Sequence, residues 1–474
     1  MIRDRIINIL KSGFPFQLSN DQLKAIEIIS DFITDKRTDS LMIIKGYAGT
    51  GKTTLVSGII KVTESVKMKA VLLAPTGRAA KVLANYSGRS AFTIHKKIYR
   101  QRSSKDAFGE FVIDRNMHKD TIFIIDESSM LSNKMNDASI FGSGNLMEDL
   151  FTYVLNGKGC RLIFIGDEAQ LPPVGFIESP ALQPGELREY SRKIYITELK
   201  DVIRQNESSG VLINATHIRN NIQKINGSLP AFRIKDYPDI ELIDGAELVD
   251  KISECYDKHG IDETIIITRS NKRANKYNEG IRRTVLWREE ELSAGDHLMV
   301  VKNNYFWISE DDNYDTDFIA NGDTAEIVKI HKYEEIYEFR FADVTLRFND
   351  YSIEIRTKII LDTLYVEAPS LSAEDNRKLF YNILEDYSNI KGKRNQYTKV
   401  KENEFFNALQ VKFAYAVTCH KAQGGQWKAV FIDQGYLVKD MINIDYLRWL
   451  YTAFTRTTDK LYLVNFSGKL FDFK

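Results

Sequence analysis

The stretch LMIIKGYAGTGKTTL, Leu41 to Leu55, joins an apolar segment to a glycine-rich turn that ends in Lys52 and Thr53. The pattern GxxxxGK[ST] surrounds a phosphate chain, because its glycines let the backbone curl with the N–H groups pointing inward and a helix N-terminus lies behind. In such a loop the lysine contacts the β and γ phosphates, and the threonine hydroxyl binds Mg²⁺. We therefore predict a strand, a nucleoside-triphosphate site and a helix in this order. The residues predicted to bind the nucleotide here are Gly46, Ala48, Gly49, Thr50, Gly51, Lys52, Thr53 and Thr54.

A second apolar segment, in TIFIIDESSM, carries Asp126 and Glu127 at its carboxyl end. Open α/β sheets bind their ligands at this end of the strands. Asp126 is predicted to complete the metal site opposite Thr53, and Glu127 to orient and deprotonate a water for attack on the γ-phosphate. An isolated acidic pair after a strand is more often a helix cap, and only the phosphate loop favours the catalytic interpretation.

A third segment, RLIFIGDEAQLPPVG, ends in a loop that contains Gln170. The motifs GYAGTGKTT, APTGRAA, DESSM and GDEAQLPPVG together resemble the superfamily 1 helicases, and most closely the RecD-like and Dda-like members of the 1B branch, with relatives of Pif type. The resemblance extends from about Leu18 to Val464, with the motifs in the order of that family.

The resemblance implies further residues of an ATP site. Gln170 matches a sensor of the γ-phosphate, and Arg204 and Arg456 match arginines that reach this phosphate from the far side of a cleft. Gln22 matches a glutamine that reads adenine, although Ser19 and Gln22 also fit a capping box that needs no ligand. Gly424 is placed with the nucleotide-binding residues. For a lone arginine a surface ion pair is the commoner role.

Short polar loops after the core strands are candidates for nucleic-acid contacts, because hydroxyls, amides and N–H groups hold phosphates without reading sequence. The predicted contacts are Pro75, Thr76, Arg78, Thr93, His95, Phe108, Asn271, Thr418, His420 and Lys421. For His95 and His420 a packed core position is the alternative. Phe108 and Phe111 are the candidate strand-separating wedge, and simple packing within a hairpin is the alternative for both.

The strand pattern predicts an α/β fold with two RecA-like P-loop domains, whose parallel sheets are flanked by helices. Apolar segments alternate with amphipathic helices up to about residue 202, and a second set contains ETIIITRSN, VKFAYAV, KAVFID and KLYLV. Between the two sets, alternating segments such as VTLRF predict half-exposed antiparallel strands. We expect a first domain over residues 1–202 with a hairpin insertion at 96–120, a second domain in two parts, 203–302 and 408–474, and a β-rich, barrel-like insertion at 303–407. The basic run KGKRNQYTKVK is expected to be a solvated loop.

Composition limits the possible partners. Formal net charge is zero, with 65 basic and 65 acidic residues, so any surface for nucleic acid must be a local stripe of cations. The three cysteines lack paired or metal-type spacing, and we expect neither a disulfide nor a zinc site. No apolar run is long enough to cross a bilayer, and the amphipathic start MIRDRIINILKSGF has no long apolar core. We expect a cytoplasmic protein without a membrane partner.

The resemblance implies an ATP- and Mg²⁺-dependent DNA helicase, monomeric, that moves 5′ to 3′ on single-stranded DNA and unwinds forked duplex DNA. Its pathway, in replication, recombination or repair, and its protein partners are not specified by the motifs. Three alternatives stay open. They are a translocase that displaces proteins without unwinding, an RNA-directed helicase of the same superfamily, and a nonenzymatic switch that binds ATP.

Overall fold

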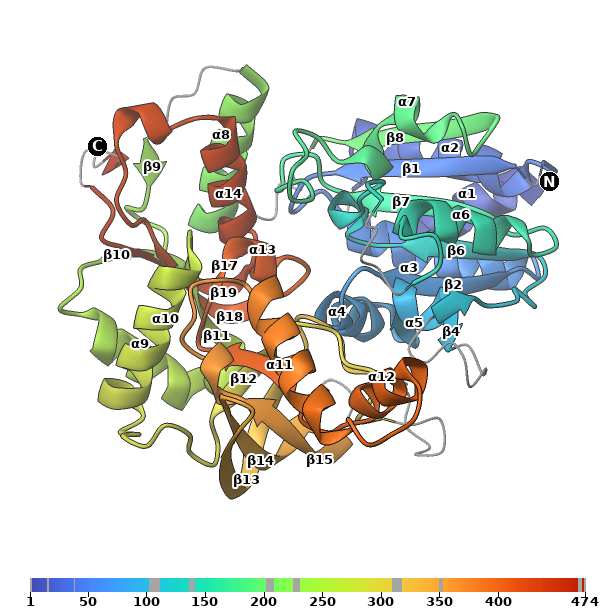
Figure 1. Cartoon of the computed structure of the whole chain (residues 1–474). Helices are drawn as coiled ribbons and strands as arrows, with labels where there is room; N and C mark the ends of the chain where they lie inside the picture. Colours follow the sequence, from blue (N-terminus) through green and yellow to red (C-terminus); the bar gives the residue numbers. More distant parts are fainter. Residues whose placement is uncertain are drawn as a thin grey trace.

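The computed structural model describes residues 2–14, 17–37, 39–101, 111–135, 141–201, 209–224, 231–308, 318–348, 353–467 and 471–472. Arg204 and Phe108 lie outside the described residues. The chain forms two α/β lobes that lie side by side, with a barrel below the second lobe in the view of Figure 1. Among the described residues, none of the helices combines the length and the apolar character that a membrane span requires.

The first lobe is built on a six-stranded parallel sheet with the order β3-β2-β6-β7-β1-β8. Central strands β1, β6 and β7 are buried at nearly every residue, which explains their continuous apolar runs in the sequence. The strands are β1 (Ser40–Gly46), β2 (Lys69–Ala74), β3 (Ala91–Thr93), β6 (Thr121–Ile125), β7 (Arg161–Gly166) and β8 (Lys193–Leu199). The helices are α1 (Ile2–Ser12), α2 (Asn20–Thr34), α3 (Lys52–Ser65), α4 (Gly77–Ser87), α5 (Ile94–Ile98), α6 (Leu146–Leu155) and α7 (Pro184–Leu187).

The base of the predicted hairpin insertion is present as the antiparallel pair β4 (Tyr99–Gln101) and β5 (Phe111–Ile113). Phe111 is buried in an aromatic cluster with Phe141, Tyr305 and Phe318, whose rings lie 4.6 to 6.3 Å apart between centroids. The prediction of Phe111 as a wedge is therefore wrong, because its ring joins the hairpin base to residues next to the barrel.

The second lobe contains a parallel sheet with the order β10-β19-β18-β11-β17. Helices α8 and α14 pack against each other beside it (Figure 1). The strands are β10 (Ile240–Ile243), β11 (Thr264–Thr268), β17 (Ala416–Thr418), β18 (Trp427–Asp433) and β19 (Thr457–Val464), and a small separate pair is β9 (Phe232–Arg233) with β20 (Phe471–Asp472). The helices are α8 (Gly210–Lys224), α9 (Leu248–His259), α10 (Asn271–Gly280), α13 (Cys419–Ala422) and α14 (Ile444–Phe454).

The predicted β-rich insertion is a closed five-stranded barrel, so the predicted α/β class with two parallel sheets, a hairpin and a barrel is confirmed. The barrel consists of β12 (His297–Val300), β13 (Thr324–Ile336), β14 (Phe339–Phe348), β15 (Ile353–Ile360) and β16 (Leu409–Phe413). Two helices, α11 (Ala373–Asp386) and α12 (Lys393–Lys401), connect β15 to β16. The basic run that we expected to be a loop is therefore mostly helical. The predicted domain limits at residues 202, 302 and 407 stay predictions.

The segment VKFAYAV, predicted as one strand of the second parallel sheet, serves two sheets. Residues up to Phe413 close the barrel in β16, and Ala416 begins β17 of the parallel sheet. The hydroxyl of Tyr415, between the two strands, donates to the buried carboxylate of Asp296 at 2.9 Å. The change of sheet interrupts an apolar run that is continuous in sequence.

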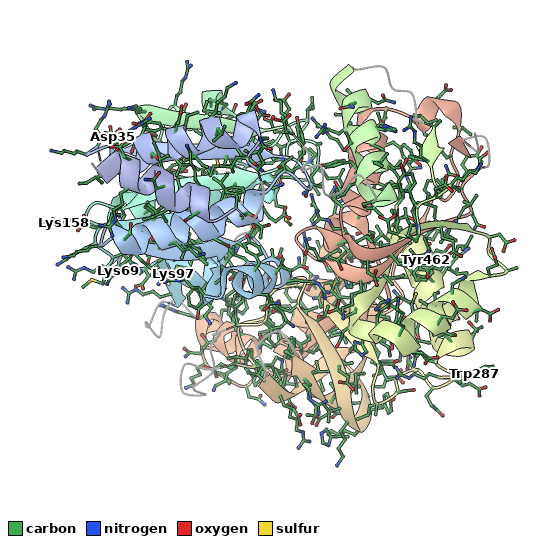
Figure 2. All side chains as sticks on the ribbon, turned by 180° about the vertical axis from the view of Figure 1, so that it is seen from behind. Asp35, Lys69, Lys97, Lys158, Trp287 and Tyr462 are labelled. Carbon is green, nitrogen blue, oxygen red and sulfur yellow. The ribbon has the colours of Figure 1, made fainter. Side chains whose placement is uncertain are left out.

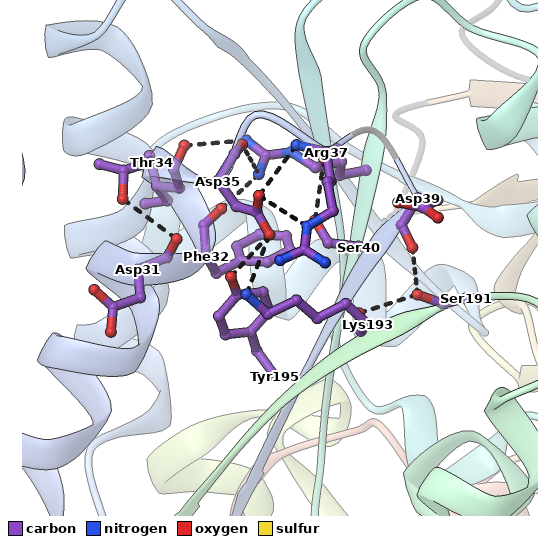
Figure 3. A network of polar contacts seen from close by, with 12 residues as sticks. Asp31, Phe32, Thr34, Asp35, Arg37, Asp39, Ser40, Ser191, Lys193 and Tyr195 are labelled. Carbon is purple, nitrogen blue, oxygen red and sulfur yellow. Dashed lines mark hydrogen bonds and ion pairs between the residues drawn. The ribbon is translucent and has the colours of Figure 1, made fainter.

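Networks of hydrogen bonds and ion pairs join elements near the surface of the molecule. Figure 3 shows one beside the first sheet, where Asp35 accepts from the hydroxyl of Tyr195 at 2.8 Å and pairs with Lys193 at 3.5 Å. Burial alone would raise the pKa of Asp35, but hydrogen bonds from Arg37 and Tyr195 lower it well below its usual value. Figure 2, seen from behind, places Asp35 on the first lobe, far from the exposed Trp287 on the second.

A buried ion network joins the barrel to the second lobe. The carboxylate of Asp296 is fully buried and lies 2.9 Å from Arg282 Nη2 and 2.7 Å from Arg288 Nη1. Because a buried charge is costly unless it is paired and hydrogen-bonded, these three residues depend on one another.

Asp296→Asn should destabilise the protein by about 3 kcal/mol, because the amide leaves the buried guanidinium of Arg282 and the partly buried one of Arg288 without a countercharge. The measurement is the urea midpoint of unfolding. Asp31→Asn is the control, since Asp31 pairs with Arg3 at the surface with half of its side chain exposed, and such pairs contribute about 0 to 1 kcal/mol. An Asp296→Asn midpoint equal to that of the wild type would show that the network does not stabilise the fold.

Candidate active site and nucleic-acid interface

The phosphate loop follows β1 and leads into α3 as predicted. Gly49 and Gly51 have φ values of 74° and 91°, in the left-handed region that glycine adopts without strain. At Gly46, a Cβ atom would lie 2.9 Å from Cγ of Lys52, so a side chain there would displace the lysine. The glycine spacing thus serves the backbone curl and the close approach of Lys52.

The amine of Lys52 lies inside this loop. Its Nζ donates to the carbonyl oxygens of Gly46, at 2.7 Å, and of Tyr47, at 2.9 Å. These contacts hold the cation where the loop N–H groups converge.

Gln22 braces the loop from α2. The capping box is confirmed, since Ser19 N donates to Gln22 Oε1 at 3.0 Å and Gln22 N donates to Ser19 Oγ at 3.3 Å. The side-chain nitrogen of Gln22, Nε2, donates to the carbonyl oxygen of Thr50 at 3.1 Å, and Gln22 is buried. Both ends of the amide are therefore engaged by the chain itself, and the contact with adenine stays a prediction.

Asp126 and Glu127 follow β6 directly, at the predicted end of the strand. Burial, followed by the charge of Glu127, raises the pKa of Asp126. The hydroxyl of Tyr86, on α4, donates to Asp126 Oδ2 at 2.5 Å, and Glu127 N donates to Asp126 Oδ1 at 2.9 Å. No pattern in the sequence pointed to Tyr86, because the contact joins two elements that only the fold brings together.

The backbone of Glu127 is strained. Its φ of 49° and ψ of 34° lie in the left-handed region, which a residue other than glycine seldom adopts. Such strain costs about 1 to 3 kcal/mol and clusters at functional sites.

Arg456, from the second lobe, lies close to the carboxylate of Glu127. Its Nη1 lies 3.6 Å from Glu127 Oε1, although the two residues belong to different lobes. The guanidinium is almost fully buried, and it also donates to the carbonyl of Thr452 at 3.1 Å and of Gly425 at 3.3 Å. The predicted base and one predicted arginine are thus neighbours across the lobe boundary.

Two residues of helix α14, Tyr451 and Thr452, make three hydrogen bonds to the first lobe. The hydroxyl of Tyr451 accepts from the loop nitrogen of Ala48 at 3.0 Å and donates to Asp167 Oδ2 at 2.7 Å. Thr452 Oγ1 accepts from the nitrogen of Leu171 at 2.9 Å. Tyr451 was not among the predicted site residues, although it stands only five residues before Arg456.

These groups surround one cleft of about 760 Å³ between the lobes. The predicted residues that line it are Ala48, Gly49, Gly51, Lys52, Thr53, Asp126, Glu127, Gln170, Gly424 and Arg456. The predicted residues Gln22, Gly46, Thr50 and Thr54 are not among the residues that line it. Within the described part of the chain, the buried Oε1 of Gln170 has no hydrogen-bond partner, which leaves this oxygen available to another group.

A second pocket, of about 190 Å³, lies between the first lobe, the second lobe and the barrel. Four predicted nucleic-acid residues line it, namely Thr76, Arg78, His420 and Lys421. Burial lowers the pKa of Lys421 to about 8, and its amine donates to Asn321, beside the barrel. Asn321 and the pair of His297 with Asp262, 3.1 Å apart, were not predicted.

Other predicted nucleic-acid residues lie outside this pocket. Thr93 caps α5 by accepting from Lys96 N at 3.2 Å, and Asn271 donates to the carbonyl of Glu367 at 3.0 Å. His95 packs against Tyr99 and Phe141, with ring centroids 5.7 and 4.9 Å away, and burial lowers its pKa to about 4. Its position fits the packed alternative. Pro75 and Thr418 are not among the lining residues either.

Comparisons with known proteins agree with this arrangement. The model of an AAA domain family matches residues 17–226, and that of the UvrD-like helicase C-terminal domain matches residues 413–464. The ATP-dependent DNA helicase Dda of enterobacteria phage T4 is 26% identical over 441 residues, which cover 88% of this chain and 92% of the relative. The ATP-dependent RecD2 DNA helicase of Deinococcus radiodurans is 33% identical over 137 residues, 28% of this chain and 16% of the relative.

Among solved structures, the Pif1 helicase from Bacteroides in complex with ADP-AlF3 and single-stranded DNA superposes with a TM-score of 0.45 and 16% identity, covering 97% of this chain and 95% of that one. The AAA domain match covers most of the first lobe and extends through α8, the UvrD-like match lies in the second lobe, and the similarity to Dda spans nearly all of both chains. The chain belongs to the superfamily 1B helicases of Dda and RecD type.

Proposed function

We propose that this protein hydrolyses ATP in the cleft between its lobes and uses the reaction to move along single-stranded DNA. The observation that carries the proposal is the approach of Arg456 to Glu127 at 3.6 Å, inside a cleft lined by Lys52. A hydrolytic site needs a base beside a cation that stabilises the charge on the transferred phosphoryl group, and the two lobes supply these groups together.

Each residue has a definite role in this proposal. Lys52 exchanges its two carbonyl partners for phosphate oxygens, and Glu127 orients and deprotonates the attacking water. Arg456 leaves Glu127 for the γ-phosphate, because a planar guanidinium matches the charge spread over that group. Arg204 is proposed to join it, as its motif predicts.

The donor set also fits Mg²⁺. Thr53 offers a hydroxyl and Asp126 a carboxylate, the oxygen ligands that this ion prefers, and both line the cleft beside Lys52. When bound, the ion neutralises phosphate charge. Thr53 and Asp126 are the residues that would hold it.

The small pocket lined by Thr76, Arg78, His420 and Lys421 is proposed to bind the DNA backbone. The first lobe supplies two of these residues and the second lobe the other two. Since both lobes contact the same strand and ATP binds between them, closing and reopening of the cleft with alternating grip would move the strand. Movement from 5′ to 3′ and unwinding of forked duplex are proposed from the family. We also propose a monomeric, cytoplasmic protein.

Two alternatives have support from particular features. The protein could translocate and displace proteins without unwinding, since the cleft and the small pocket lined by both lobes would suffice for movement along a strand. It could act on RNA, because phosphate contacts alone do not distinguish a 2′-OH. A nonenzymatic ATP switch is disfavoured, because a pure binder needs neither Glu127 nor Arg456 in this arrangement.

Lys52→Ala should abolish DNA-stimulated ATP hydrolysis while single-strand binding remains within about twofold, because the amine belongs to the phosphate site and lies away from the DNA pocket. The measurements are phosphate release and oligonucleotide anisotropy. Lys61→Ala, an exposed lysine on the same helix, is the control. Retained hydrolysis in Lys52→Ala would refute the assignment of the phosphate site.

Glu127→Gln should bind ATP normally and turn it over about 10² to 10⁴ times more slowly, since the amide cannot accept the proton from water. Nucleotide affinity and single-turnover hydrolysis separate the two effects. Glu27→Gln, exposed on α2, should behave as wild type. Near-normal turnover in Glu127→Gln would require another base.

Polarity and unwinding are tested together on paired duplexes that carry either a 5′ or a 3′ single-stranded tail. Strand separation should occur only with the 5′ tail. Separation from the 3′ tail would contradict the proposed direction. ATPase stimulation without strand separation on either substrate would favour the non-unwinding translocase, and stronger stimulation by RNA oligonucleotides would favour the RNA-directed helicase.

A further inference from the structure

Helix α4 has one end at each of the two pockets. Near its C-terminus, Tyr86 lines the nucleotide cleft and donates its hydroxyl proton to Asp126 at 2.5 Å. Near its N-terminus, Thr76 and Arg78 line the pocket assigned to the DNA backbone. At 1.5 Å per residue, about 12 Å of helix separate Arg78 from Tyr86. In Figure 1, α4 lies on the side of the first lobe that faces the second lobe and the barrel.

The first turn of α4 is held by the second lobe. Arg78 Nη2 donates to the carbonyl of Gln426 at 3.1 Å, and its guanidinium lies 4.1 Å from the centre of the Trp427 ring. The adjoining loop is so close that a Cβ at Gly424 would lie 2.7 Å from Cβ of Ala79. A displacement of the second lobe relative to the first would therefore act directly on this turn.

On its own lobe, α4 packs against β2, β3 and α3, mostly through small side chains. Its buried residues are Gly77, Ala79, Ala80 and Leu83; Leu83 enters the main core of the first lobe, and the ring of Tyr86 packs against that core. The two alanines pack in a separate small cluster with Ala74 and Ala91. Alanine side chains bury little apolar area, so a small shift of the helix costs little.

Each carboxylate oxygen of Asp126 has its own hydrogen-bond donor, and Tyr86 is one of the two. The carboxylate is fully buried, and its other oxygen, Oδ1, accepts from the backbone nitrogen of Glu127. The hydroxyl of Tyr86 fixes the remaining oxygen, Oδ2. A tyrosine hydroxyl ordinarily keeps its proton at neutral pH, so the short contact makes it a donor to this carboxylate.

We propose that Tyr86 is a positioning residue for Asp126, and that α4 transmits the position of the second lobe and of bound DNA to this carboxylate. The inference rests on the proposed function of the cleft as an ATP site. Coupling of this kind is reciprocal, so whatever moves the first turn of α4 alters the carboxylate, and occupation of the cleft alters the grip at Arg78.

Tyr86→Phe tests the positioning role, because it keeps the ring and removes only the donor. The experiment compares, by calorimetry, the affinity for a nonhydrolysable ATP analogue with and without Mg²⁺. In the wild type Mg²⁺ should tighten binding. In Tyr86→Phe, the ratio of the affinity with Mg²⁺ to the affinity without it should fall about tenfold, which corresponds to about 1.4 kcal/mol. The affinity without Mg²⁺ should stay unchanged. An unchanged gain, or an equal loss with and without Mg²⁺, would overturn the positioning role.

A second measurement tests transmission along α4. The ratio of ATPase rates with and without single-stranded DNA should fall about tenfold in Tyr86→Phe, with oligonucleotide affinity unchanged. An unaltered ratio would overturn the proposed transmission.

Tyr195→Phe is the matched control, since its hydroxyl also donates to a carboxylate, that of Asp35 at 2.8 Å, but outside the cleft. It should retain wild-type values in both experiments, and a Tyr195→Phe loss equal to that of Tyr86→Phe would overturn the specific role. The proposed function fails separately, if the wild type itself shows no DNA-stimulated hydrolysis.

Discussion

The hydroxyl of Tyr451 is the contact on which the geometry of the cleft depends. It reaches from the second lobe to the phosphate loop at Ala48 and to Asp167 behind it, so one buried group touches both parts of the first lobe's site. Burial, together with Asp167, raises the pKa of Tyr451 well above its ordinary value, which keeps the hydroxyl neutral and able to donate. Because Arg456 lies on the chain just beyond α14, this anchor also determines where its guanidinium can lie.

The sequence was sufficient to predict those parts of the site whose geometry depends on the local backbone. The strand before Gly46 is continuously apolar because it is buried on both faces of a parallel sheet, and Gly49 and Gly51 adopt the left-handed φ values that a curled phosphate loop needs. Asp126 and Glu127 were predictable for the same reason, since a carboxyl end of a buried strand is a fixed place in this architecture.

The sequence was insufficient where a side chain contacts an element that lies far away along the chain. VKFAYAV reads as one strand, yet the need to close a barrel divides it at Tyr415. Phe111 and His95 were both predicted to contact nucleic acid, but an aromatic cluster between the hairpin base and the barrel side buries Phe111 and packs against the half-buried ring of His95. Tyr86 had no local signal, because its partner is 40 residues away. Gln22 satisfied two patterns at once, and the backbone around it engages both ends of the amide.

Among the described residues, the two cationic groups that line the cleft, Lys52 and Arg456, have partners within the chain, and this constrains how a nucleotide could bind. Lys52 is bonded to two carbonyls and Arg456 to Glu127, so each cation is compensated where it would otherwise be buried at a cost. A triphosphate must therefore replace these contacts rather than merely add new ones. The free energy available to move the lobes is the difference between the contacts that a nucleotide makes and the carbonyl and carboxylate contacts that it replaces. A ligand shifts an equilibrium by no more than its differential affinity for the two states. In the proposed mechanism, withdrawing Arg456 from Glu127 would also free the carboxylate to act as a base, so the step that brings the arginine to the phosphate would be the same step that makes the base available.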